Sequence, residues 1–324
     1  MADLGHRSRS RSRGQLILVT ALALAAIFLG LAVIVNSAIF TENLATRNEN
    51  VESTEALEYR HSVTQYMGEI VEFANEHNNS QYDYIERNVS DGTADASLYT
   101  SIQQAEDGAG LSLEKVGDRE GARIFQNDGG TFADNESNPE WTLAEDVEHT
   151  RAFELNISKP GDFTINVTEM TSSDEWTMEI DTSSGSDDNL TVTNPDGDTG
   201  TCSFGTIESV DLTGAVVNGS PCPALIDTED GESLQLRDAF DSEYRIKFEN
   251  SDKVEGNYSL VVAGSSLDDA GDIRTNRDNY TTVDGPGTGP YVRPAMYSAR
   301  FELEYETPRV LYETDITVAP GESP

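Results

Sequence analysis

Few residues of this chain have the types and spacing that enzyme chemistry requires. The four histidines are His6, His61, His77 and His149, and they form no His-Glu-x-x-His zinc motif. The sequence also has no Gly-x-Ser-x-Gly elbow, phosphate loop or dinucleotide fingerprint. With 59 Asp and Glu residues, pairs of carboxylates along the sequence carry no information on acid–base catalysis. We therefore expect a protein that is not an enzyme, with no catalytic residue, cofactor or bound metal.

The two cysteines, Cys202 and Cys222, are separated by 19 residues. On the outside of a cell, a single cysteine pair predicts one disulfide bond. In the chain-entropy model, closing a loop of this size stabilises the fold by about 3 kcal/mol. The alternative is a pair of free, buried thiols.

One acidic stretch, residues 184–198, invites a calcium hypothesis because aspartate oxygens are hard donors. It contains Asp187, Asp188, Asp196 and Asp198. The stretch lacks the spacing of a calcium loop that ends in a bidentate glutamate. A solvated strand edge with a proline-glycine turn is the favoured interpretation, and calcium binding by the acidic loops stays open.

Nine asparagines lie in Asn-x-Ser/Thr sequons, which are acceptors for glycosylation on exported proteins. Several fall within predicted strands, so we expect a minority of them to be used. The candidates are Asn78, Asn88, Asn135, Asn156, Asn166, Asn189, Asn218, Asn257 and Asn279.

Four aromatic residues, Trp141, Trp176, Tyr291 and Tyr297, would stack on a sugar ring if they were exposed. Aromatic residues of this kind are more often part of a core. A glycan-binding function therefore depends on their exposure.

The charge of the chain is strongly acidic, with 21 basic and 59 acidic residues and only four lysines. Beyond residue 14 there are 17 basic and 58 acidic residues, which gives this part a net charge of −41. Such charge opposes a compact state at ordinary ionic strength, whereas at molar salt the Debye length falls to about 3 Å. The composition indicates an extremely halophilic surface, and it argues against nucleic acid as a partner.

Residues 16–40 form the longest apolar segment, and no charge occurs between Arg13 and Glu42. A helix of this length spans roughly 37 Å, enough to cross a bilayer core of about 30 Å. Arginines precede the segment at positions 7, 9, 11 and 13. By the positive-inside rule they stay in the cytoplasm. We expect a single-pass protein of the cell membrane, with the lipid bilayer as a partner and its C-terminal domain outside the cell.

The junction Arg13-Gly14-Gln15, which opens directly onto the apolar segment, resembles the class III signal of archaeal type IV pilins. The resemblance implies cleavage between Gly14 and Gln15, with the apolar helix kept for assembly with other pilin-like subunits. Val19 stands at the fifth mature position, where many bacterial pilins have glutamate. Residues 13–47 and 141–158 also resemble a family of uncharacterised haloarchaeal membrane-anchored proteins. The alternative to processing is an uncleaved signal anchor.

After the apolar segment, the sequence predicts an amphipathic helix that ends near residues 77–79. The apolar residues recur every three or four positions, which defines one helix face. This face comprises Ala56, Tyr59, Val63, Tyr66, Ile70 and Phe73, widened by Met67, Val71 and Ala74.

Residues 80–140 give mixed signals. Two short helices are expected, around Tyr82–Val89 and Ala96–Gln104. Residues 111–116 and 122–126 alternate like strands and flank the glycine-containing segment 117–121, which predicts a hairpin. Residues 127–140 are turn-rich and are expected to form a loop.

From Arg151 onward, short alternating segments separated by turn signals predict an antiparallel β-sandwich or jelly-roll-like domain. Residues 265–290 are expected to form one long exposed loop. The predicted α+β architecture is a basic cytoplasmic leader (1–14), a transmembrane helix (15–41), a helical extension (42–77), a mixed α/β and loop segment (78–150) and an extracellular β-rich domain (151–324).

Two functions are consistent with this organisation. The first is a non-enzymatic, membrane-anchored haloarchaeal surface protein, with a minor pilin-like subunit as its specific form. The second is a membrane-tethered extracellular module that binds a glycan or another component of the cell envelope.

Overall fold

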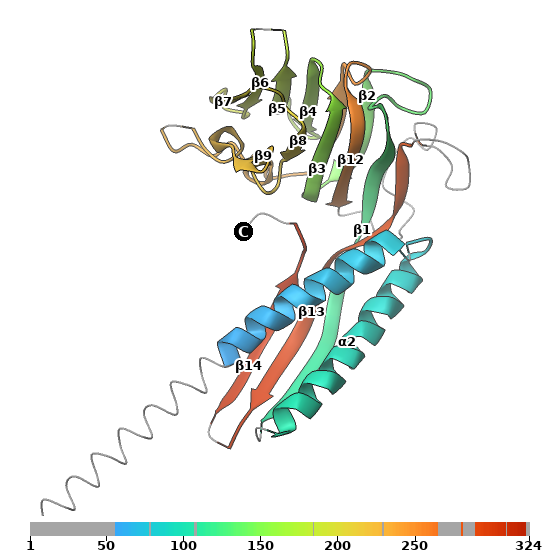
Figure 1. The fold of residues 1–324 in the computed structure, drawn as a ribbon, viewed down its shortest axis with the longest axis vertical. Helices are drawn as coiled ribbons and strands as arrows, with labels where there is room; N and C mark the ends of the chain where they lie inside the picture. The colour runs from blue at the N-terminus through green and yellow to red at the C-terminus, as the bar shows by residue number, and fades with distance from the viewer. Residues whose placement is uncertain are drawn as a thin grey trace, which may run out of the picture.

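A computed structural model of the chain describes two helices and two antiparallel β-sheets (Figure 1). The described residues are 56–77, 79–106, 109–183, 185–228, 230–264, 280, 289–308 and 310–321. The helices are residues 56–77 and α2 (Tyr82–Glu106), with short 3-10 turns η1 (Pro223–Leu225) and η2 (Leu236–Asp238). The strands are β1 (Gly110–Thr131), β2 (Trp141–Val147), β3 (His149–Lys159), β4 (Phe163–Glu169), β5 (Glu175–Asp181), β6 (Asp188–Thr193), β7 (Thr199–Phe204), β8 (Ser209–Asp211), β9 (Val216–Val217), β10 (Ser220–Pro221), β11 (Tyr244–Glu249), β12 (Glu255–Ala263), β13 (Tyr291–Glu306) and β14 (Leu311–Val318).

The two sheets have eight and six strands. Their orders are β10-β9-β8-β3-β12-β1-β13-β14 and β2-β11-β4-β5-β6-β7. Every described strand pair within them is antiparallel. The prediction of a mainly antiparallel β protein with few helices is confirmed, and the arrangement is compatible with a β-sandwich. We use the name sandwich for the part of the molecule in which the two sheets pack on each other.

Aromatic side chains fill the core between the sheets. Phe163 and Phe248 come from the six-stranded sheet and Tyr258 from the eight-stranded sheet, and all three pack around Phe132. The ring centroids of Phe248 and Tyr258 lie 5.2 Å apart in an edge-to-face arrangement, which is a favoured geometry for aromatic pairs. In β4, β5, β6 and β11 buried residues alternate with less buried ones, as the period of two predicted.

The lower half of Figure 1 is a second layered structure, which we call the helix-covered module. It consists of the 56–77 helix and α2 packed on β14 and on the adjoining parts of β1 and β13. Val63, Met67 and Val71 of the first helix contribute to a buried cluster that includes Phe301 and Ile316 of the sheet. Because β1 and β13 run through both halves, the module and the sandwich share one sheet.

The predicted apolar face of the first helix is partly wrong. Ala56, Val63, Met67, Val71 and Ala74 are buried, as expected. Tyr66 and Phe73, in contrast, are 49% and 58% exposed. The sheet covers a narrower arc of the helix than the hydrophobic pattern suggests, so these two rings remain on its flank.

The two short helices predicted after residue 80 are one continuous helix, α2. Gly92 lies inside α2, although glycine is a poor helix former. In the structure, a Cβ atom at Gly92 would lie 3.1 Å from two side-chain carbons of Ile70. The glycine therefore serves the close approach of α2 to the first helix.

The hairpin predicted at residues 117–121 is also wrong, since this segment lies inside β1. β1 pairs with β13 through it, with register shifts between Lys115 and Gly117 and between Arg119 and Glu120. A Cβ atom at Gly121 would lie 2.5 Å from the carbonyl oxygen of Val262 on β12. Pairing with β13, two bulges and the close approach of β12 explain why this segment contains glycines that resembled turn residues.

Other boundaries differ as well. β1 continues to Thr131, so the predicted loop at 127–140 is shortened to residues 132–140. Strands from before and after residue 150 share both sheets, since β1 lies between β12 and β13, and β2 pairs with β11.

In the described part of the chain, no helix is long and apolar enough to cross a bilayer. The predicted leader (1–14), the predicted membrane segment (15–41) and most of the predicted loop at 265–290 lie outside the described residues. Tyr280, the one described residue of 265–288, is buried against Trp141.

Candidate functional site

The histidines that the structure describes lie on separate elements. His61 and His77 are on the first helix, where the His77 ring stacks on Phe73 at a centroid distance of 4.3 Å. His149 begins β3 and lies 5.9 Å from the Tyr297 ring. Among the described residues, no group of three or more His, Cys, Asp and Glu side chains is arranged to hold a metal.

The aspartates of the acidic stretch are not brought together. Asp188 begins β6 and accepts a hydrogen bond from the backbone N–H of Ile207 at 2.9 Å. Asp198 lies beyond the other end of β6, in a turn where its backbone N–H donates to Asn194 Oδ1. A six-residue strand separates the two ends by about 20 Å. The aspartates therefore do not converge on one site. The predicted strand edge is wrong, because β6 pairs with both β5 and β7 and is an interior strand of its sheet.

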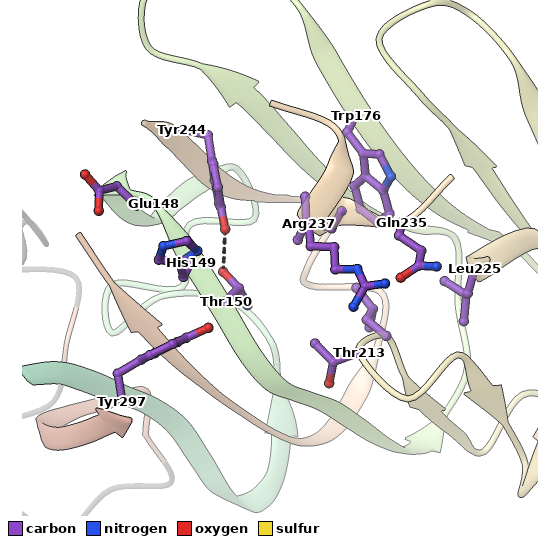
Figure 2. A pocket seen from close by; sticks show the side chains of 12 residues that line it. Glu148, His149, Thr150, Trp176, Thr213, Leu225, Gln235, Arg237, Tyr244 and Tyr297 are labelled. Atoms are coloured by element: carbon purple, nitrogen blue, oxygen red, sulfur yellow. Dashed lines mark hydrogen bonds between the residues drawn. The ribbon is translucent and has the colours of Figure 1, made fainter. Parts of the chain in front are cut away.

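A small hollow lies at the start of β3, between the two sheets (Figure 2). His149, Thr150, Gln235 and Arg237 contribute polar groups to its lining. Tyr244 is fully buried here, and its hydroxyl lies 2.9 Å from Thr150 Oγ1. Burial raises the pKa of the Tyr244 hydroxyl above its usual value, so this group stays neutral. The cavity volume of about 40 Å3 accommodates water but not a sugar ring.

The aromatic candidates for sugar binding are mostly core residues. Trp141, Trp176 and Tyr297 are at most 3% exposed, and Tyr291 is half-buried. The indole N–H of Trp176 donates to the backbone carbonyl of Leu234 at 2.8 Å. Three of the four rings therefore belong to the core, and Tyr291 is the one that is partly accessible.

The predicted disulfide bond is confirmed. Cys202, on β7, is bonded to Cys222, which precedes η1. β7 is an edge strand of the six-stranded sheet, and Cys222 follows β10 at the edge of the eight-stranded sheet. The bond therefore links an edge strand of the six-stranded sheet to the residue that follows an edge strand of the eight-stranded sheet.

The sequons differ in accessibility. Asn135, Asn156 and Asn218 are exposed, whereas Asn88, Asn166, Asn189 and Asn257 are half-buried. The side chain of Asn218 accepts hydrogen bonds from two backbone N–H groups and donates one to the carbonyl of Thr206, so it closes a loop. Asn78 and Asn279 lie outside the described residues.

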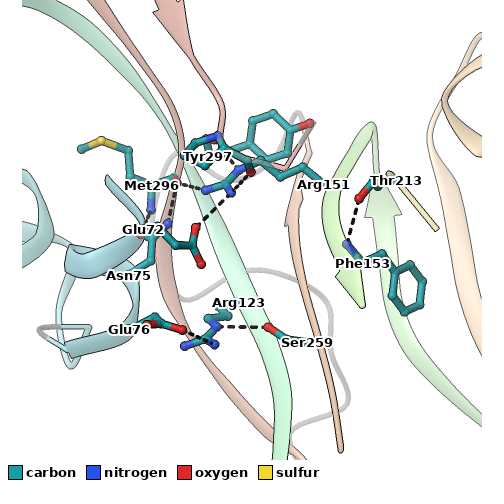
Figure 3. Close-up of polar contacts among 11 residues, drawn as sticks. Glu72, Asn75, Glu76, Arg123, Arg151, Phe153, Thr213, Ser259, Met296 and Tyr297 are labelled. Carbon is teal, nitrogen blue, oxygen red and sulfur yellow. Dashed lines mark hydrogen bonds and ion pairs between the residues drawn. The ribbon is translucent and has the colours of Figure 1, made fainter. Parts of the chain in front are cut away.

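The most extensive polar network surrounds Arg151, a fully buried residue of β3 (Figure 3). Its guanidinium donates to the backbone carbonyls of Tyr297 at 2.7 Å, Met296 at 2.9 Å and Pro320. The carboxylate of Glu72, on the first helix, lies 3.4 Å from Nη1. One side chain thus links β3, β13, the chain after β14 and the first helix.

The Arg151 network was not predicted from the sequence. Phe153, Leu155 and Ile157 occupy alternate positions of β3 and face the core between the sheets. Arg151 lies beyond a register shift of β3 against β12 and pairs with Val261, which belongs to a separate buried cluster. The strand alternation therefore gave no signal for a buried arginine, and its partners on β13 and the first helix are distant in sequence.

The surface of the helix-covered module is unusually apolar for so acidic a chain. Of the large apolar side chains that are exposed in the described part of the structure, most lie on its two helices. They are Leu57, Tyr66, Phe73, Tyr84, Leu98, Tyr99 and Ile102. Large exposed apolar groups of this kind indicate surfaces that bind another molecule.

Comparison with protein-family models, with curated proteins and with solved structures finds no match for this chain. The functional argument therefore rests on the residues and their geometry.

Proposed function

We propose that this chain is a non-enzymatic, membrane-anchored surface subunit of a haloarchaeon, with a pilin-like organisation. A basic leader stays in the cytoplasm, the apolar segment 16–40 holds the chain in the bilayer, and the β-rich part lies outside. The acidic, lysine-poor surface supports a location in concentrated salt.

The observation that carries this proposal is the position of the first helix. Residue 56 is already helical, at the end of the helix-covered module that lies farthest from the sandwich (Figure 1). From there the helix lies along the antiparallel strands β13 and β14, with Met67 and Val71 fully buried. A helix that follows an apolar N-terminal segment and packs on an antiparallel sheet is the arrangement that a pilin-like subunit needs.

The distributed placement of histidines and aspartates supports a non-enzymatic role. The polar groups of the described part that lie deepest, such as Arg151 and Asn75, bind backbone atoms of neighbouring elements. These side chains therefore hold neighbouring elements together.

The decisive experiment is N-terminal sequencing of the native protein extracted from membranes. A mature chain that begins at Gln15 supports the pilin-like subunit, and the substitution Gly14→Val should then abolish processing. Gly5→Val, in the same leader but away from the junction, is the matched control and should be processed normally. A membrane-embedded chain that begins at Met1 or Ala2 would contradict pilin-like processing and leave a tethered surface domain.

A further inference from the structure

The lower part of α2 carries a continuous apolar patch. Leu98, Tyr99 and Ile102 are 56%, 67% and 58% exposed. Because residues three or four positions apart are neighbours on a helix surface, these side chains form one surface, which we call the α2 patch. From Ser97 to Ala105 the helix has no charged residue. In a chain with a net charge of −38, an uncharged helix segment that carries three exposed apolar side chains is exceptional.

The α2 patch lies at the end of the module where the N-terminal part of the chain joins it. Ala56, the first described residue, is buried in one cluster with Ala109, three residues after α2, and with Tyr305. The start of the first helix and the end of α2 are therefore close together, on the side away from the sandwich (Figure 1). Residues 1–55, including the apolar segment, attach at this end.

We propose that the α2 patch is a contact surface between two copies of this chain. The inference rests on the proposed function, because it requires the apolar segments to hold the copies in one membrane or assembly. Residues Ala21, Ala23, Ala25, Ala26 and Gly30 give the apolar segment small side chains that let identical helices approach closely. Association of these segments brings the α2 patches of two copies within reach of each other.

A bilayer is a poorer occupant of the patch. Fifteen residues, 41–55, separate the apolar segment from the described domain, and five of them are charged. This polar stretch places the domain in the aqueous phase, beyond the lipid. Asp95, one turn before the patch, would also have to approach the membrane surface with it.

The size of the patch fits a contact between tethered copies. Three large side chains provide on the order of 400 Å2, about half of the 800 Å2 per partner in a standard interface. Free domains would associate weakly through so small a surface. Tethering raises the effective concentration of the second copy to the millimolar range, where a small apolar contact is sufficient.

Cysteine cross-linking tests the inference on the full-length protein in native membranes at high salt. Since Cys202 and Cys222 are bonded to each other, Tyr99→Cys introduces the single free thiol of the chain. A short bis-maleimide should convert most of this variant to a product of twice the chain mass. Met170→Cys, at a residue of the sandwich that is 36% exposed, is the matched control and should give at least fivefold less product.

A second variant separates patch contact from random collision. Adding Leu98→Asp and Ile102→Asp to Tyr99→Cys places two carboxylates in the patch and should reduce the cross-linked product at least fivefold. Both positions are exposed, so the fold should tolerate the changes, which circular dichroism would verify.

Three results would overturn the inference. One is equal cross-linking of Tyr99→Cys and Met170→Cys in membranes. Another is a product whose mass is not twice that of the chain, which would indicate a different protein partner. The third is quenching of a fluorophore on Tyr99→Cys by lipid-borne nitroxides, which would indicate the bilayer. A chain that does not fractionate with membranes would contradict the proposed function itself, so failure of the anchor and failure of the patch are distinguishable.

Discussion

Asn75 of the first helix exchanges two hydrogen bonds with the backbone of Met296 on β13. Its Nδ2 donates to the carbonyl of Met296 at 3.0 Å, and its Oδ1 accepts from the N–H of Met296 at 2.8 Å. The register of β13 against β1 shifts at this point, between the pairs Arg119–Ser298 and Glu120–Met296. The asparagine therefore satisfies strand backbone groups of β13 and joins the helix to the sheet.

Substitution of Asn75 should destabilise the protein markedly. In Asn75→Ala the buried N–H of Met296 loses its hydrogen bond to the Asn75 side chain, whereas the carbonyl of Met296 keeps the bond from Arg151. We expect a loss of about 2–4 kcal/mol in the free energy of unfolding, measured by denaturant titration at high salt. Gln65→Ala, at an exposed position of the same helix, should change it by less than about 0.5 kcal/mol. Equal effects of the two variants would contradict the assigned role of Asn75.

Arg151 should be replaceable by neither lysine nor methionine. Lysine cannot place donors on three backbone carbonyls in the fixed geometry of a guanidinium, and methionine leaves those carbonyls with fewer donors. We expect Arg151→Lys to cost about 2–4 kcal/mol. It should also increase hydrogen exchange at Gly321 and the residues before it, because Arg151 binds the carbonyl of Pro320. Unchanged exchange in this tail would show that other contacts hold it.

The sequence predicted the elements whose signals are local. Alternation along β4, β5 and β11 identified strands of the sandwich, and the helical period identified the buried side of residues 56–77. The glycines of residues 117–121 were misleading, because Gly121 serves the close approach of β12, which is distant in sequence. The buried arginine, the long shared strands and the α2 patch depend on long-range pairing, which no local pattern encodes.

Glu154 should show a pH-dependent effect on stability. Desolvation raises the pKa of its carboxyl, and Asp211, its direct partner across β3 and β8, raises it further. Glu72 and Glu76 act in the same direction, and Arg123 opposes them. Since the folded pKa is above the unfolded value of about 4.3, stability falls as the pH rises through this range. Glu154→Gln should therefore raise the Tm at pH 7.

The gain from Glu154→Gln should disappear below about pH 4, where the glutamate is protonated in both states. Thermal melts at several pH values and constant high salt measure this. Glu208→Gln, at another exposed glutamate, controls for the general effect of removing one negative charge. A pH-independent gain equal to that of the control would contradict the local explanation.

The disulfide bond should contribute measurably to stability. Cys202→Ala removes the link between β7 and the segment before η1, and we expect a loss of about 2–4 kcal/mol. Reduction of the wild-type protein should give a similar loss. Non-reducing peptide mapping should recover one linked peptide pair, whereas two freely alkylated thiols without prior reduction would disprove the bond.

Carboxylates face one another across the three strands of the helix-covered module. Glu302 on β13 lies directly opposite Glu114 on β1 and Asp315 on β14, and Glu304 lies opposite Glu313. Glu114, Glu302 and Asp315 are exposed on the sheet face that the helices do not cover. Like charges directly opposite in neighbouring strands repel, so this sheet depends on screening by salt.

The outer region should therefore fold only at high salt, with the helix-covered module as its most salt-sensitive part. Circular dichroism should show a folded protein in about 3 M salt and loss of structure in about 0.1 M salt, where screening is weak. Glu302→Thr removes the central carboxylate and adds a good strand former, so it should shift the folding midpoint to lower salt. Glu136→Gln, in the exposed loop after β1, removes one charge without a facing carboxylate and should shift the midpoint less. An unchanged spectrum and Tm across the salt range would contradict the halophilic interpretation, and equal shifts for the two variants would contradict the role of the facing carboxylates.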